Sequence, residues 1–134
     1  MAKRYFTKEE ADAMLPVIRG QLLALQDVKR RFEAKLAELQ QAKQTLYRNG
    51  TSGDHDPLFT IECEIEFLQI EAQTHAGSIA TKGVELKDID YGLVDFPALV
   101  DGEEVLLCWK LGEPAVAHYH GYHDGFAGRK PLDP

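Results

Sequence analysis

The stretch LPVIRGQLLALQDVKRRFEAKLAELQQAKQTL, residues 15–46, carries apolar residues in alternating steps of three and four. This spacing places them on one side of an α-helix, in a coiled-coil-like seam of about four heptads, or about 45 Å. So narrow an apolar stripe predicts a helix that packs along a partner helix. The seam residues are Leu15, Ile18, Leu22, Leu25, Phe32, Leu36, Leu39 and Leu46, and Lys29 and Lys43 fill two further seam positions.

The partner helix is predicted at residues 58–82, where the same spacing returns. Residues 61–67 also alternate between apolar residues and glutamates, which is the pattern of a half-buried strand. We favour a helix because glutamate is a poor strand former and because the three-four spacing continues well past this stretch. The spacing involves Leu58, Ile61, Ile65, Leu68, Ala72, His75 and Ile79. His75, like the two lysines, is a polar seam residue of the kind that sets register or partner number.

The predicted helix boundaries have recognisable signals. Thr7 and Glu10 form a capping box, so the first helix should begin at about residue 8. Pro16 should break or kink that helix, or open the next one, because proline cannot donate a backbone hydrogen bond. Residues 48–57 are rich in Gly, Asn and Asp and are predicted to be an exposed turn, and Gly83 should end the second helix.

Beyond Gly83 the sequence changes to short apolar or alternating runs at 84–86, 92–100, 105–109 and 115–120. These predict strands, and Asp101-Gly102 predicts a tight hairpin turn between two of them. Residues 121–134 are rich in Gly and Pro and are predicted to be loop. The expected fold class is therefore α+β. One domain, residues 1–134, combines an antiparallel helical hairpin at about 8–82 with an antiparallel sheet of three to four strands at about 83–134.

Composition narrows the class of protein. The chain has 134 residues, a net charge of −7 and two cysteines, and no apolar run long enough for a secretion signal or a membrane span. We therefore expect a cytoplasmic protein without a membrane or nucleic-acid partner. The charge is uneven, at +4 for residues 1–48 and −5 for residues 49–82, which favours pairing of the two helices. The cluster Lys29-Arg30-Arg31 is interpreted as a solvated face rather than a nucleic-acid site.

Four segments resemble a bacterial and archaeal family catalogued as domain of unknown function number 2203. They are RYFTKEEADAMLP (4–16), KDIDYGLVDFPA (87–98), EVLLCWKLGEP (104–114) and HYHGYHDGFAGRKPL (118–132). The resemblance spans nearly the whole chain in the same order and implies a shared fold, but it assigns no activity. It also implies a His-aromatic-His element followed by acidic residues. His118-Tyr119-His120 match this element, whereas His123 stands where an acidic residue is usual.

His118 and His120 are the predicted metal ligands. On a strand, residues two apart point to the same face, so both imidazoles can reach one cation. Zinc, nickel or iron would suit imidazole and carboxylate ligands, and hydrolysis would be the natural reaction. The alternative is a pair of hydrogen-bonded surface or interface histidines. Further residues that could complete a metal site are Asp95, Glu113, His123 and Asp124.

Further binding residues are predicted in the same region. Arg129 lies among glycines and can contact an anion, although turn formation also explains those glycines. Trp109 and Tyr119 are expected to be core or interface aromatics. Asp95, within an apolar strand, must face solvent, cap a backbone amide or bind a ligand. Cys108 is interpreted as a small buried apolar residue rather than a reactive thiolate.

Two functions compete on this basis. The first is a protein-interaction module that forms a homodimer through its helical hairpins, because most of the sequence is devoted to a seam that two helices alone rarely bury. The second is a metal-binding protein or metal-dependent enzyme that uses His118 and His120. The sequence does not decide whether the protein is an enzyme.

Overall fold

The computed structural model describes residues 3–49 and 56–132, in which two long helices precede a five-stranded antiparallel sheet. The helices are α1 (Lys8–Asn49) and α2 (Pro57–Thr81). The strands are β1 (Glu85–Asp88), β2 (Leu93–Val100), β3 (Glu103–Lys110), β4 (His118–His120) and β5 (Lys130–Pro131), and a short 3-10 helix spans Phe126–Gly128. The α+β class and the helical hairpin are confirmed.

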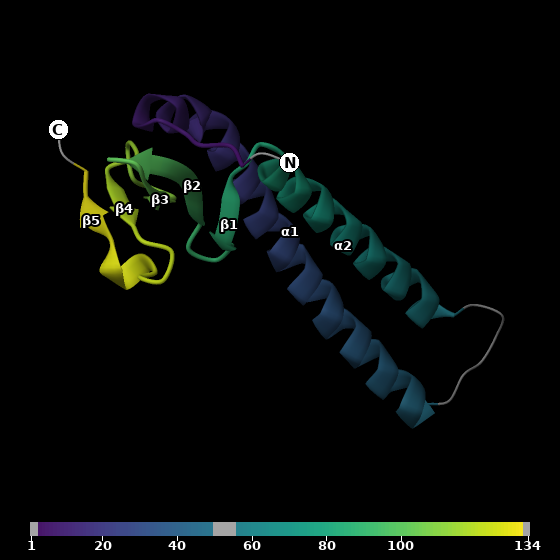
Figure 1. The fold of residues 1–134 in the computed structure, drawn as a ribbon. Helices are drawn as coiled ribbons and strands as arrows, with labels where there is room; N and C mark the ends of the chain where they lie inside the picture. The colour runs from purple at the N-terminus through teal and green to yellow at the C-terminus, as the bar shows by residue number, and fades with distance from the viewer. Residues whose placement is uncertain (1–2, 50–55, 133–134) are drawn as a thin grey trace.

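Helix α1 begins at the predicted capping box. The Glu10 amide donates to Thr7 Oγ1 over 3.1 Å, and the Thr7 amide donates to Glu10 Oε1 over 2.9 Å. The helix continues through Pro16, so neither the predicted break nor a new helix start occurs there. Burial of Leu15 on one side of the proline and Ile18 on the other offsets a cost of about 3 kcal/mol for an interior proline. Figure 1 shows α1 changing direction between the part beside the sheet and the part beside α2.

Residues 61–67 are helical, which settles the ambiguity between helix and strand in favour of the prediction. Ion pairs from Arg31 to Glu71 and from Lys35 to Glu64 link the basic α1 to the acidic α2. Helix α2 is capped by Asp56, with Pro57 as its first residue, and ends before Gly83, whose φ is +88°. The rest of the predicted turn, residues 50–55, lies outside the described residues.

Three seam positions differ from the prediction. Val28, Lys35 and Ala42 are more buried than the predicted Lys29, Leu36 and Lys43. Lys29 pairs with Asp90 between β1 and β2. The ion pair between Lys29 and Asp90 therefore links α1 to the connection between β1 and β2.

The sheet follows the order β1-β2-β3-β4-β5, so every neighbouring pair is consecutive in the chain. Asp101 and Gly102 have φ angles of +53° and +80°, and so form the predicted tight turn between β2 and β3. The sheet has one strand more than the three to four predicted. Strand β5 lies in the predicted loop, where Lys130 and Pro131 pair with β4. A two-residue strand is too short to produce an alternating pattern.

The main core lies between one face of the sheet and the near half of α1. It joins Leu15, Ile18 and Leu22 of the helix to Phe96 of β2 and Trp109 of β3. The far half of the hairpin, residues 36–49 of α1 and 57–70 of α2, projects away from the sheet (Figure 1). Within the part of the chain that the structure describes, the two helices there pack only against each other. Among the described residues, neither helix is apolar enough over its length to cross a membrane.

Candidate metal centre

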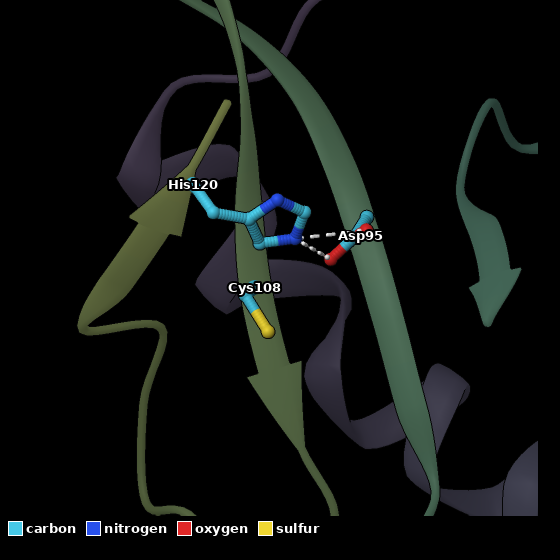
Figure 2. Close-up of side chains that lie close together, drawn as sticks. All are labelled: Asp95, Cys108 and His120. Atoms are coloured by element: carbon cyan, nitrogen blue, oxygen red, sulfur yellow. Dashed lines mark hydrogen bonds and ion pairs between the residues drawn. The ribbon is translucent and has the colours of Figure 1, made fainter. Parts of the chain in front are cut away.

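Three potential metal ligands converge on the face of the sheet opposite the main core. Asp95 comes from β2, Cys108 from β3 and His120 from β4, and all three side chains are buried. One ligand atom of each lies within 4.8 Å of the other two. Figure 2 shows the His120 ring directed toward Asp95, with Cys108 on the strand between them. The strand register produces this arrangement, because Asp95 lies opposite Cys108, and His120 lies opposite Leu106, two residues from Cys108.

The hydrogen bonds of His120 fix its tautomer. Its Nδ1 lies 2.8 Å from the Gly121 carbonyl oxygen, which can only accept, so Nδ1 carries a proton. In the neutral ring, Nε2 then carries a lone pair and no proton. It lies 3.1 Å from both carboxylate oxygens of Asp95. Two acceptors cannot face each other at this distance unless a proton, carried by either side chain, or a metal ion lies between them.

Asp95 is the most deeply buried acidic side chain of the site. The residue is 2% exposed, and its described hydrogen-bond partner is His120 rather than solvent or a backbone amide. Burial raises the pKa of its carboxyl group, although the neighbouring His120 acts in the opposite direction. A buried carboxylate of this kind is stable only beside a positive partner.

Cys108 is buried as the sequence predicted, but it is also a potential ligand. Burial raises the pKa of its thiol to about 11, so the metal-free side chain is a thiol and not a reactive thiolate. A bound cation reverses this preference, because a coordinating thiol loses its proton. Nucleophilic catalysis by a Cys-His pair is disfavoured, since both nitrogens of His120 already have partners.

A hollow of about 290 Å³ opens next to the three side chains. Leu93 and Leu106 of the sheet contribute apolar surface, and Tyr122 and Phe126 of the C-terminal segment form another part of its lining. Lys87 of β1 also lines it and forms an ion pair with Glu85. The volume is just below the usual range for small-molecule sites, so the hollow can admit a small ligand to the side chains at its base.

A second polar group adjoins the first. Arg129 binds both carboxylate oxygens of Glu113, at 3.0 and 3.2 Å, and lies over the ring of Phe126. Burial raises the pKa of Glu113, but hydrogen bonds from Arg129 and the Lys110 amide outweigh it, so this pKa lies below its ordinary value. The predicted contact of Arg129 with an anion thus has a carboxylate of the chain itself as its partner.

His118 lies beside the three-ligand group without belonging to it. It shares a face of β4 with His120 and lies directly opposite Cys108 across the strand pair. Its Nδ1 is buried, has no hydrogen-bond partner among the described residues, and lies 3.9 Å from Glu113 Oε2. A buried polar atom without a partner is uncommon and needs an explanation.

The other predicted site residues lie apart from the ligands. Trp109 belongs to the main core and donates from Nε1 to the Glu113 carbonyl oxygen, and Tyr119 packs against that core from the same face. Asp124 accepts from the Gly121 amide, and His123 is exposed. Of the site residues that the sequence predicted, Asp95 and His120 belong to the three-residue group, and His118, Glu113 and Arg129 lie next to it.

Cys108 is the potential metal ligand that sequence reasoning missed. The signal was present in the predicted turn at Asp101-Gly102. A two-residue turn there pairs 100 with 103, and continuing outward pairs Asp95 with Cys108, as observed. The sequence did not show how β4 pairs with β3, because the connection between them is irregular.

The fold and site together define a small α+β protein with a buried aspartate-cysteine-histidine cluster on the helix-free face of its sheet. By sequence, residues 4–132 match the family described as "Uncharacterized conserved protein (DUF2203)". The chain belongs to this family, as the resemblance indicated. No curated protein and no solved structure matches the chain.

Proposed function

We propose that this protein binds a divalent transition metal through Asp95, Cys108 and His120. The observation that carries the proposal is the opposition of His120 Nε2 and the Asp95 carboxylate, with Cys108 within reach. The bond from Nδ1 to a backbone carbonyl is the usual outer contact of a metal-binding histidine. Zinc fits a mixed set of imidazole, thiolate and carboxylate ligands, and iron or nickel are further possibilities for such donors.

The number of protein ligands decides what the metal does. Three ligands leave one position open, which is typical of catalytic zinc, whereas four close the site and are typical of structural zinc. An open position would face the hollow, and a zinc-bound water with a pKa of about 7 would make hydrolysis the reaction class. His118 is the candidate fourth ligand, because its buried Nδ1 has no described partner.

Metal analysis of protein purified without a histidine tag tests the site. We expect about one metal ion per chain, and with cobalt(II) a thiolate-to-metal absorption band. Cys108→Ser should remove that band, while Cys63→Ser, which changes the cysteine on α2, should leave it intact. If wild-type protein neither contains nor takes up metal, a proton and not a metal ion lies between His120 and Asp95, and the metal function is overturned.

His118→Ala then separates the two coordination models. If only three residues ligate the metal, the variant should keep its metal with little change in affinity. If His118 is the fourth ligand, affinity should fall by at least about tenfold, and the cobalt spectrum should change. Glu113→Gln is the matched control, because it removes the neighbouring charge but leaves both histidines in place.

We propose as a second function that the far half of the helical hairpin is an interaction element. Support comes from the large apolar side chains exposed there: Leu36, Tyr47, Phe59, Phe67 and Ile70. Leu36, Phe59 and Ile70 lie on one side of the hairpin, and apolar side chains exposed on one side are typical of interaction sites. Light scattering of the full chain across a range of concentrations tests for self-association, and binding partners can be sought separately.

A further inference from the structure

We infer, on the basis of the proposed interaction function, that one particular face of the hairpin binds a second copy of this chain. The face is marked by a groove of about 360 Å³ where the hairpin meets the sheet, lined by Phe32 of α1, by Gln69 and Gln73 of α2 and by Ile89 between β1 and β2. We call it the groove face. Its occupant is the groove face of another protomer, so that two hairpins form a four-helix arrangement.

Helical spacing identifies the other residues of the groove face. On α1, steps of four and seven place Leu36 and Lys43 on the side of Phe32, and Tyr47 follows four residues later. On α2, Glu62 and Glu66 precede Gln69 at steps of four and three. Phe59 and Ile70 border the same side and are 66% and 58% exposed. The face thus combines exposed apolar side chains with polar ones, namely Lys43 on α1 and glutamates and glutamines on α2.

Charge complementarity selects a second copy as the occupant. Residues 28–49 of α1 contain six Lys or Arg and two Glu, whereas α2 contains four Glu and neither Lys nor Arg. Four of these basic residues and two of these glutamates already pair within the chain. Lys43 of α1 and Glu62 and Glu66 of α2 form no ion pair with another described residue. A second copy turned about an axis along the hairpin places its basic α1 over this acidic α2, and the reverse contact forms by symmetry.

Apolar contacts supply most of the binding in this arrangement. Exposed ion pairs contribute little, so the charges chiefly select the stacking of α1 on α2 and disfavour α1 on α1. Ile70 of one copy would lie at the level of Phe32 of the other and so cover the groove, while Phe59 would lie farther from the sheet, at the level of Lys43. Each copy contributes the same set of residues, as a closed dimer requires.

Sedimentation of the full chain with a matched pair of variants tests the face. Wild type should sediment as a dimer of the 15.0 kDa chain at about 10 μM. Phe59→Glu should weaken the dimer at least about a hundredfold, because it buries charges twice in one symmetric interface. Phe67→Glu changes an equally exposed aromatic on the same helix, but one that lines the opposite side of the hairpin, and should leave the dimer intact.

Charge reversal tests the pairing of helices. Glu62→Lys alone should weaken the dimer about tenfold, and adding Lys43→Glu in the same chain should restore it. A monomeric wild type overturns the proposed dimer, while capture of a foreign basic helix by that monomer would preserve the interaction function. A dimer sensitive to Phe67→Glu but not to Phe59→Glu overturns the groove face alone. Circular dichroism of each variant confirms that it is folded.

Discussion

At the scale of single residues, the His120 and Asp95 pair is the most constrained feature of the protein. Both side chains are at least nine-tenths buried, and each is the main partner of the other. A buried pair of this kind adds little stability compared with apolar residues. Removing one partner is nevertheless costly, because the other then stays buried without a counter-charge. Its presence on the helix-free face therefore favours a functional explanation over a structural one.

Asp95→Ala should lower the free energy of unfolding by about 3 to 5 kcal/mol, because it leaves His120 buried without its partner. Urea denaturation followed by circular dichroism measures the change. Glu103→Ala, which removes an exposed carboxylate from β3, should change stability by no more than about 0.5 kcal/mol. Equal effects of the two substitutions would contradict the assignment of Asp95 to a buried pair.

Glu113 predicts a particular dependence of stability on pH. Its pKa in the folded protein lies below the ordinary value of 4.5, so the unfolded chain binds the proton more readily. The stability that the pair with Arg129 contributes is therefore present above about pH 4.5 and is lost as the pH falls through the folded pKa. Between these values, wild type should lose more stability than Glu113→Gln. Parallel curves for the two proteins would contradict the role of this ion pair.

At the scale of elements, local sequence signals predicted boundaries better than they predicted packing. The capping box, Gly83 and the Asp101-Gly102 turn act through their own backbone geometry and lie where the sequence placed them. Lys29 and Pro16 depend on what the helix packs against, and the sheet overrides the local preference at both. Strand β5 had no signal, because two residues paired to an edge carry no periodicity.

Two glycines predict opposite effects of the same substitution. Gly20 lies inside α1 with open space around its missing side chain, so Gly20→Ala should stabilise the protein by about 0.5 to 1 kcal/mol. Gly92 has a φ of +68°, and an added Cβ would lie 2.6 Å from Leu111 Cβ. Gly92→Ala should therefore destabilise by more than about 1 kcal/mol. Thermal unfolding of both variants measures the difference, and a shift in the same direction would contradict this account.

At the scale of the whole molecule, the two candidate functional regions lie at opposite ends of the structure. The sheet and the near half of α1 hold the main core and the candidate metal centre, while the far half of the hairpin carries exposed apolar residues. The sequence predicted both parts but not how they meet, because the contact between helix and sheet joins residues distant along the chain. The guanidinium group of Arg19 on α1, which lies over the ring of Trp109 on β3, makes one such contact.

Hydrogen exchange should reveal this division. At concentrations where the chain is monomeric, amides in residues 36–49 and 57–64 should exchange faster than those of β2 and β3, because two helices alone give little protection. Mass spectrometry of peptides from each region measures the rates. Uniform protection at low concentration would contradict the division, and protection of the hairpin that rises with concentration would report association.

The consecutive order of the strands has a practical consequence. Because β2, β3 and β4 follow one another, all three candidate ligands lie within residues 95–120, and none comes from the hairpin. The far half of the hairpin can therefore be shortened or lengthened by whole helical turns while the three donor atoms stay in place. Such variants would keep the same candidate metal ligands and differ in the length of the projecting helices.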